Sequence, residues 1–127
     1  MKIRVYYEDT DCGNVVYYAN YLKYMERGRT EYMRQRGIDL ERFHEKGFLF
    51  VVTESHVKYR QPAKYNDLLE VESRIAETTS VTITFETDIY NQKNELLVTG
   101  SVRLACISAE TNKACKAPKE LIDALSK

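Results

Sequence analysis

Three features of the amino-acid sequence predict an α+β fold in which one curved antiparallel sheet wraps around a single long helix. First, apolar residues recur at spacings of three and four between residues 16 and 35, as on one face of a helix. Second, four later segments alternate apolar and polar residues, as strands do. Third, short turns join these segments, so we expect consecutive strands to pair as an antiparallel meander. A chain of 127 residues predicts one domain, over residues 1–127.

The N-terminal part of the chain contains the long helix and the turn before it. Residues 2–8 are predicted to form a short strand, and the polar stretch 9–14 ends in a Gly-Asn turn signal. The predicted helix, residues 16–35, is followed by an Arg-Gly pair that is typical of a helix end. Its expected buried face comprises Tyr18, Tyr21, Leu22, Met25, Gly28, Tyr32 and Met33. At 1.5 Å per residue this helix would be about 30 Å long, so the rest of the domain must pack along it.

The remaining sequence predicts four strands and a short helix. A polar connection over residues 38–47 comes first. The predicted strands are residues 48–60, 67–77, 81–90 and 96–107, and the last helix is 118–125. The residues expected to share a face within each strand are Leu49, Val51, Thr53, Ser55, Val57 and Tyr59, then Leu69, Val71, Ser73 and Ile75, then Val81, Ile83, Phe85 and Ile89, and finally Val98, Gly100, Val102, Leu104 and Cys106. A strand, a long helix and four further strands, about five strands in all, are the element order of a hotdog fold.

The composition excludes several classes of protein. Lys and Arg together number 19, as do Asp and Glu, so no net charge attracts nucleic acid. No apolar run approaches the roughly 18 residues of a membrane span, and the N-terminus lacks a signal peptide's apolar core. We therefore expect a cytoplasmic protein with no integral membrane segment and no nucleic-acid partner. The three cysteines lack the spacing of a disulfide framework or zinc site. We expect most of the ten tyrosines to serve as core and interface residues.

Two aspartates, Asp9 and Asp11, lie in a tight turn just before the predicted helix. An Asp at such a place ordinarily caps the helix or stabilises the turn. A helix N-terminus also presents unpaired N–H groups that can hold an oxyanion. A carboxylate beside it can attack a carbonyl or activate a water molecule. Together these groups suffice to cleave a thioester, whose thiolate leaves without strong acid assistance, and the residues alone leave both interpretations open.

The string DTDCGNVVYYANYLKYMERGRTE, residues 9–31, resembles the signature of the 4-hydroxybenzoyl-CoA thioesterase-like hotdog family, most closely its YbgC-type acyl-CoA thioesterases. A second block, YRQPA at 59–63 followed by DLLEV at 67–71, is also similar. The resemblance spans roughly residues 2–107. It implies a hotdog fold and hydrolysis of the thioester of a small acyl- or aromatic-CoA. We expect no cofactor.

The resemblance also implies roles for particular residues. Asp11 would be the catalytic carboxylate, as nucleophile or general base, and the backbone N–H at Tyr18 would be the oxyanion donor. Many YbgC-type members have a histidine at the second position, and the 4-hydroxybenzoyl branch has tyrosine, so acyl specificity stays open. The active site of the family lies between subunits, which implies a homodimer or homotetramer. The implied substrate contacts are Thr79, Ser80, Val81 and Thr82 of a partner subunit for pantetheine, and Lys58, Arg60 and Lys64 for the nucleotide phosphates.

Other interpretations of the same residues are weaker. The Asp9–Gly13 stretch superficially resembles a calcium loop, but the later ligands are missing, so we expect no metal. Cys12 could be a nucleophile only with a base, and neither histidine is nearby in sequence. Glu26 on the helix is a fallback carboxylate, because a related hotdog branch uses a helix glutamate. The alternative function is a non-catalytic module that binds acyl-CoA or an acyl carrier protein. A hotdog dehydratase is disfavoured, because it needs a histidine near the helix start.

Overall fold

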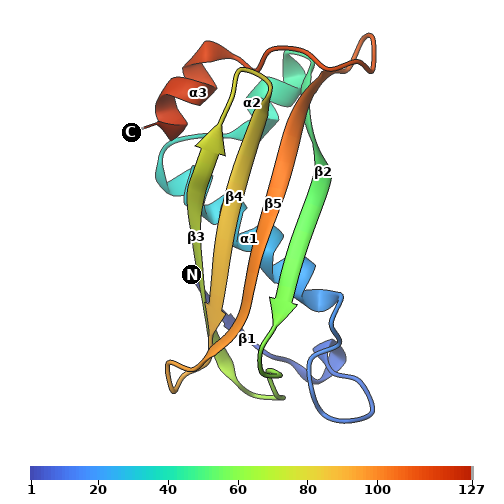
Figure 1. Ribbon diagram of the computed structural model, residues 1–127, viewed down its shortest axis with the longest axis vertical. Coiled ribbons are helices and arrows are strands. Elements are labelled where there is room, and N and C mark those ends of the chain that lie inside the picture. The colour runs from blue at the N-terminus through green and yellow to red at the C-terminus, as the bar shows by residue number, and fades with distance from the viewer. Residues whose placement is uncertain (127) are drawn as a thin grey trace.

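Five strands form one antiparallel sheet with the order β1-β3-β4-β5-β2 (Figure 1). The computed structural model of the protein describes residues 1–126. The strands are β1 (Lys2–Arg4), β2 (Phe48–Tyr59), β3 (Leu68–Thr78), β4 (Thr82–Tyr90) and β5 (Leu96–Ser108). The helices are the 3-10 turn η1 (Tyr7–Asp9), α1 (Asn20–Gln35), α2 (Leu40–Glu45) and α3 (Lys119–Leu125). The sheet curls around α1, while α2 and α3 lie together toward one end, so the predicted α+β architecture is confirmed.

The neighbours of β2 differ from the prediction. Only β3, β4 and β5 form the expected meander, whereas β2 pairs with β5 and lies at the edge of the sheet. Residues 60–67 carry the chain from the end of β2 to the start of β3 without a hairpin between these two strands. Alternation of residues therefore identifies the strands correctly but does not determine which strands are neighbours.

The helix α1 begins at Asn20, four residues later than predicted. Val15 and Val16 have extended backbone instead and form isolated bridges, Val15 with Lys64 and Val16 with Thr10. The Val16 N–H donates to the Ala63 carbonyl at 2.8 Å. Two consecutive β-branched residues favour extended backbone, which explains why the helical spacing of residues 16–19 was misleading.

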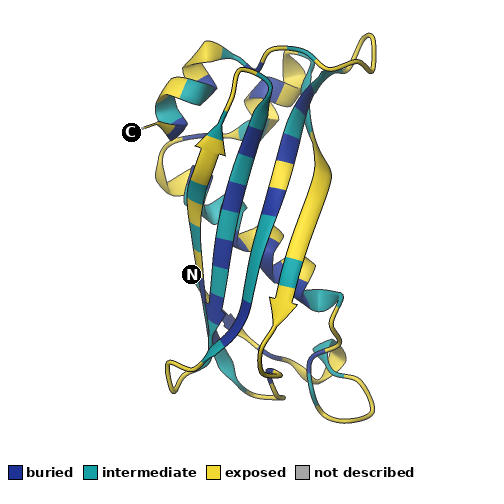
Figure 2. Ribbon diagram, in the orientation of Figure 1, coloured by how far each residue is buried: buried dark blue, intermediate teal, exposed yellow. Residues whose placement is uncertain are grey.

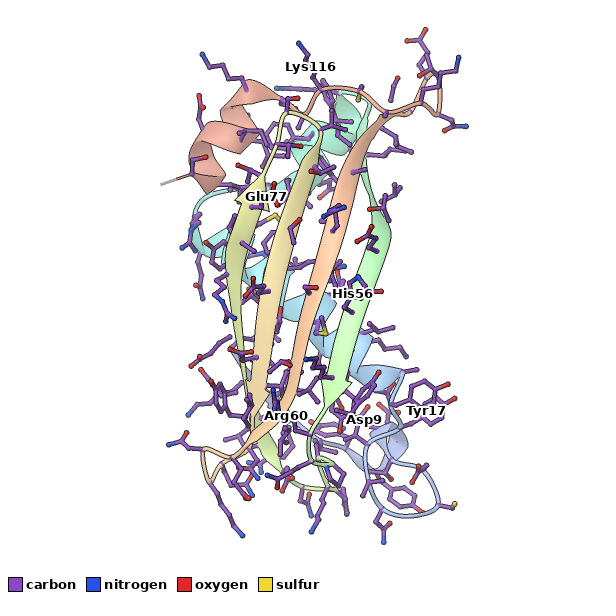
Figure 3. All side chains as sticks on the ribbon, in the orientation of Figure 1. Asp9, Tyr17, His56, Arg60, Glu77 and Lys116 are labelled. Carbon is purple, nitrogen blue, oxygen red and sulfur yellow. The ribbon has the colours of Figure 1, made fainter. Side chains whose placement is uncertain are left out.

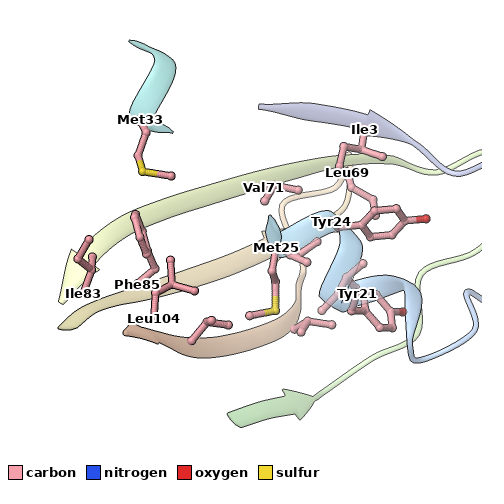
Figure 4. Close-up of a cluster of buried hydrophobic side chains, with 14 of the residues drawn as sticks. Ile3, Tyr21, Tyr24, Met25, Met33, Leu69, Val71, Ile83, Phe85 and Leu104 are labelled. Atoms are coloured by element: carbon pink, nitrogen blue, oxygen red, sulfur yellow. The ribbon is translucent and has the colours of Figure 1, made fainter. Parts of the chain in front are cut away.

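The apolar face of α1 packs on the sheet (Figure 4). Its buried residues are Tyr21, Tyr24, Met25, Gly28 and Met33. A Cβ at Gly28 would lie 2.7 Å from a Cγ of Val71, so only glycine allows α1 to approach β3 this closely. Gly100 of β5 makes room for Met25 in the same way, because a Cβ there would lie 2.5 Å from Met25 Cε. The helix is thus fixed against both β3 and β5.

The predicted burial holds for three strands and fails in two places. The buried residues of β3, β4 and β5 include Leu69, Val71, Ile83, Phe85, Ile89, Val98, Val102, Leu104 and Cys106, as predicted (Figure 2). In β2 the register shifts between Val52 and Glu54, so Phe50 and Val52, opposite Cys106 and Leu104, share the helix-facing side. The prediction of Leu49 and Val51 on that side is wrong. Tyr18, just before α1, and Leu22 on α1 were predicted to be buried but are exposed.

Two short segments also differ from the prediction. The strand predicted at residues 2–8 ends at Arg4, because Asp9 accepts a hydrogen bond from Tyr6 N–H at 2.9 Å and closes η1. The connection at 38–47 contains α2, whose Asp39 cap accepts from Glu41 N–H at 3.0 Å.

Across residues 1–126, no helix has the length and apolar composition needed to span a membrane.

Candidate active site

The loop between η1 and α1, residues 10–19, carries both predicted catalytic groups, and we call it the site loop. It lies at the end of the sheet where β2 ends and β3 begins (Figure 1). Its tip turns at Asn14, which has a φ of 62°, a left-handed conformation that asparagine tolerates well. The tip is held from outside by Tyr65 N–H, which donates to the Asn14 carbonyl at 3.3 Å. The segment between β2 and β3 therefore supports the site loop.

The two aspartates of the turn have different surroundings. Asp9 is half-buried, and both its carboxylate and its carbonyl accept hydrogen bonds from protein groups. Asp11 is exposed, and its Oδ1 accepts only from Gly13 N–H, at 2.8 Å. Within residues 1–126 its Oδ2 has no partner. Asp9 is thus a structural group, whereas Asp11 offers a carboxylate oxygen to a ligand or a water molecule.

Tyr18 lies in the turn that leads into α1, two residues before the helix. Its N–H has no acceptor among the described residues, 1–126, whereas the neighbouring Tyr17 N–H donates to the Asp9 carbonyl. The first N–H groups of a helix share this lack of partners and carry partial positive charge. The predicted donor is therefore a free N–H, although the helix begins after it rather than at it.

A cavity of about 220 Å³ adjoins Tyr18. It is lined by Val16, Tyr18, Tyr21, Tyr59, Arg60, Gln61 and Pro62. The rings of Tyr18 and Tyr59 meet edge to face at 6.3 Å between centroids, and the rings of Tyr59 and Tyr21 are 5.5 Å apart. Burial raises the pKa of Tyr21, whose hydroxyl accepts from Ala63 N–H at 3.0 Å. This aromatic cavity can take an apolar or aromatic group beside Tyr18.

The predicted phosphate-binding residues lie at or just after the end of β2, and Figure 3 shows Arg60 at the end of the molecule that carries Asp9 and Tyr17. Arg60 follows β2 directly and lines the aromatic cavity. Lys58 is exposed near the end of β2, and Lys64 is exposed in the following segment. None of these three side chains has a carboxylate partner within the described part of the chain, so their charges are available to an anionic ligand.

The predicted pantetheine-binding residues, 79–82, form the turn between β3 and β4 at the opposite end of the sheet. Within one chain the structure does not bring them to Asp11. The Thr79 hydroxyl is used inside the turn, since it accepts from Val81 N–H at 3.2 Å and Thr82 N–H at 2.9 Å. Ser80 and Val81 accept through their carbonyls, from Ala117 N–H and Cys106 N–H respectively.

The weaker candidates lie apart from this arrangement. Glu26 lines a different cavity, of about 500 Å³, between α1 and α2, and accepts a hydrogen bond from the Thr30 hydroxyl at 3.1 Å. Cys12 is an exposed free thiol on the site loop. Cys106 and Cys115 are also free, with sulfurs 3.4 Å apart, and burial raises the pKa of Cys106 to about 12. Residues 1–126 contain no group of three or more His, Cys, Asp or Glu arranged to hold a metal ion.

The sequence analysis did not single out Tyr59, Tyr21 and Asn20 as site residues. Tyr59 could have been found, because it is the last residue of the β2 alternation and begins the YRQPA block. Asn20 carried a weaker signal, an amide at the first position of a helix. Its partner is the backbone carbonyl of Asp9, which no residue pattern reveals.

Comparison with known proteins identifies the family. The family model described as "Thioesterase-like superfamily" matches residues 5–125. This chain belongs to the thioesterase-like superfamily. It is 40% identical over 121 residues to an acyl-CoA thioesterase YbgC of Haemophilus influenzae, covering 94% of this chain and 88% of that protein. It is 35% identical over 120 residues to an acyl-CoA thioester hydrolase YbgC of Escherichia coli, covering 94% and 90%.

Solved structures of the superfamily agree with the fold. A DHNA-CoA thioesterase from Staphylococcus aureus superposes with a TM-score of 0.94 at 26% identity, covering 99% of this chain and 87% of that one. A probable thioesterase from Bartonella henselae superposes with a TM-score of 0.81 at 33% identity, covering 93% and 96%. The predicted family, the hotdog fold and the enzyme class, a thioester hydrolase, are thereby confirmed.

Proposed function

We propose that this thioesterase-like protein hydrolyses acyl-CoA thioesters, with Asp11 as the catalytic carboxylate and Tyr18 N–H as the oxyanion donor. The observation that carries the proposal is the coexistence, on one short loop, of an exposed carboxylate and an unpaired backbone N–H. The named relatives that act on acyl-CoA support the substrate class. A cavity beside Tyr18 supports the presence of an acyl-binding pocket at this place.

The chemistry needs only these two groups and water. The thioester carbonyl oxygen would accept a hydrogen bond from Tyr18 N–H, which stabilises the negative charge that develops on it. As a nucleophile, the Asp11 carboxylate would attack the carbonyl carbon and expel the CoA thiolate, and water would hydrolyse the resulting anhydride. As a general base, it would instead take a proton from the water that attacks the same carbon. Both routes give the free acid and CoA.

The substrate can be divided among the neighbouring groups. The acyl group would enter the aromatic cavity, whose volume of about 220 Å³ suits a small acyl or single-ring group. The exposed, unpaired cations of Lys58, Arg60 and Lys64 would contact the nucleotide phosphates. Residues 79–82 would contact pantetheine only from a partner subunit.

A second copy of the chain is part of the proposal, and β2 is the surface that supports it. This strand is 12 residues long, lies at the sheet edge, and exposes Val51 and Val52 at 38% and 51%. A long edge strand without proline is a template for pairing with another strand. Two β2 strands related by a two-fold axis would pair antiparallel and extend the sheet.

Such pairing would also bring the two ends of the molecule together across the interface. The 79–82 turn lies at the Phe48 end of β2, because Thr82 pairs with Ala105, which pairs with Val51. In an antiparallel β2 pair, the partner's Phe48 end lies beside this chain's Tyr59 end. The partner's 79–82 turn would therefore lie toward this chain's site loop, in a homodimer or in a homotetramer of such dimers.

A substrate panel tests the proposed function. Purified protein is assayed on short-, medium- and long-chain acyl-CoAs and on aromatic acyl-CoAs, with thiol release as the readout. We expect turnover on at least one small acyl- or aromatic-CoA. Saturable acyl-CoA binding by calorimetry without turnover on any of them would instead favour the binding module, and the same assay with acyl carrier protein would identify that partner. One domain over residues 1–127 and a cytoplasmic location stay predictions.

A further inference from the structure

The site loop has no regular secondary structure, so its shape depends on a few anchors. Asp11 is fixed by bonds within the loop, since its N–H donates to the Val15 carbonyl at 3.0 Å and its carbonyl accepts from Asn14 N–H at 3.1 Å. These bonds define a closed tip. They do not determine how the tip is oriented relative to Tyr18 and α1. The segment 63–65 holds the tip and Val16 from outside, and the base of the loop joins the tip to Tyr18 and α1.

The base of the loop is closed at one atom, the carbonyl oxygen of Asp9. This oxygen accepts from Tyr17 N–H at 2.9 Å and from the Asn20 side-chain Nδ2 at 2.8 Å. Tyr17 immediately precedes Tyr18, and Asn20 is the first residue of α1. The carbonyl therefore joins the residue before the loop to the turn that carries the free N–H and to the helix itself.

Asp9 is itself held firmly, so it can serve as a fixed point. Its carboxylate accepts from Tyr6 N–H at 2.9 Å and its N–H donates to the Tyr6 carbonyl at 3.0 Å. Among the loop-base contacts, the Asn20 amide is the one side-chain hydrogen bond within residues 1–126 that links α1 to this point. It spans 11 residues in sequence and is partly buried.

We infer that Asn20 is a positioning residue, whose side-chain amide fixes the orientation of the Asp11 carboxylate relative to the Tyr18 N–H. The inference rests on the proposed function of these two groups. Residue 20 must donate to a carbonyl oxygen from the first position of the helix. Asparagine can do this because its amide has two N–H donors, whereas an aspartate of the same shape has no donor and repels the carbonyl.

Two substitutions separate positioning from stability. Asn20→Asp abolishes the hydrogen bond, yet a carboxylate in the first turn of a helix is electrostatically favourable, so the helix should remain stable. Asn20→Ala removes the amide without adding a charge. Gln35→Glu is the matched control, because it makes the same amide-to-acid change at an exposed position at the far end of α1.

The first readout is hydrogen–deuterium exchange, which needs no substrate. We expect Asn20→Ala and Asn20→Asp to accelerate exchange in peptides covering residues 10–18, with no change in the sheet and no change in Gln35→Glu. The second readout is steady-state kinetics on the best acyl-CoA. We expect kcat to fall about ten- to a hundredfold, as misplacement by an ångström can produce, with KM changed less than twofold.

The outcomes distinguish the inference from the proposed function. Unchanged exchange in residues 10–18, or kcat within twofold of the parent protein while Asp11→Asn is inactive, would overturn the role of Asn20 and leave the proposed function intact. Full activity of Asp11→Asn would remove the proposed function, and the exchange measurement would still decide whether Asn20 holds the loop. If Asn20→Ala is too unstable to purify, Asn20→Asp carries the test.

Discussion

The two ends of the molecule differ in how completely their polar groups are satisfied. At the end with the 79–82 turn, the Thr79 hydroxyl and the Ser80 and Val81 carbonyls are all used in hydrogen bonds within the chain. At the end with the site loop, one oxygen of Asp11 and the Tyr18 N–H have no partner within residues 1–126. Both groups belong to exposed residues, so water can satisfy them and a ligand could replace that water, as the proposed function requires.

Cavity volume alone would select a different site, between α1 and α2, and is the poorer guide. The cavity of about 500 Å³ between α1 and α2 is larger than the aromatic cavity of about 220 Å³. The larger one contains Glu26, a carboxylate already accepting a hydrogen bond from Thr30. The smaller one is lined by Tyr18, whose N–H is free within residues 1–126 and which shares the site loop with the exposed Asp11 carboxylate. The comparison teaches that free donors and acceptors on one loop are a better guide to the candidate site than cavity volume.

The strongest test of this comparison exchanges a carboxylate for an amide on the site loop and, separately, in the larger cavity. We expect Asp11→Asn to lower kcat by about a thousandfold, the scale of a lost catalytic acid–base group or nucleophile. Glu26→Gln should keep kcat within twofold, because Glu26 lines the other cavity. Rates on the best acyl-CoA, with circular dichroism to check folding, make the measurement. Equal losses in the two variants would break the comparison.

The second test prevents two copies of the chain from pairing through β2. Val52→Lys places a charge on the exposed edge strand β2, where it opposes strand pairing. We expect the mass measured by light scattering to fall to that of one chain and kcat/KM to fall at least tenfold, because residues 79–82 of a partner can no longer reach the site. Lys23→Ala, at an exposed position of α1, is a control that should change neither quantity. A monomeric variant with full activity would show that one chain holds the complete site.

The third test concerns the aromatic cavity. Tyr59→Ala removes a ring that contacts both Tyr18 and Tyr21, so we expect KM for the best small acyl-CoA to rise about tenfold. Tyr65→Ala removes a similarly exposed ring that contacts Tyr7 and does not line the cavity. This control should leave KM within twofold. A larger effect at Tyr65 than at Tyr59 would move the acyl pocket out of the aromatic cavity.

The smallest expected effect is at Tyr24, beneath the base of the site loop. Burial, and then the negative charge of Asp9, raise the pKa of Tyr24 above its ordinary value of 10.0. Its hydroxyl makes no hydrogen bond within the described residues, so Tyr24→Phe should change the free energy of unfolding by less than about 1 kcal/mol at pH 7. Because the folded pKa exceeds the unfolded one, this tyrosine's contribution is complete below pH 10 and is lost as pH rises further.

Denaturant unfolding at pH 7 and pH 11 checks this expectation. Tyr24→Phe should lose less stability between the two pH values than the parent protein does. Tyr21→Phe is the matched variant, because it leaves the buried Ala63 N–H without its acceptor. It should cost about 1–3 kcal/mol at pH 7. If Tyr24→Phe proves the costlier of the two at pH 7, the Tyr24 hydroxyl has a partner after all.

The sequence predicts the elements of this fold better than their junctions. Alternation located β3, β4 and β5 and their buried faces within a residue or two, because a strand buried on one face repeats with a fixed period. It missed the partner of β2, which depends on contacts far apart in the chain. It also misplaced the start of α1, because Val15 and Val16 are fixed by residues near 63, and local spacing contains no information about that contact.

The candidate site likewise contains residues that the sequence could predict and contacts that it could not. Asp11 and Tyr18 could be named from a family-like segment, since the roles proposed for them depend on residue type and local order. Tyr59 itself carried a signal in the YRQPA block, but the contacts that form the cavity around it and the anchor at Asn20 could not be derived. Each depends on a contact between segments that are distant in sequence, or on a backbone atom that every residue possesses. Residues 79–82 could be named but not located, because one chain leaves them at the far end of the sheet.

The segment between β2 and β3 also determines when the site can form. The site loop is complete in sequence by residue 19, but its outside supports, the Ala63 carbonyl and Tyr65 N–H, come more than forty residues later. During synthesis from the N-terminus, the loop must therefore wait, without a stable shape, until all of β2 has been made. Forming such non-local contacts requires the closure of a long loop, which is slow. Catalytic competence should thus appear late in folding, after the helix has formed and only when residues 63–65 reach the N-terminal segment.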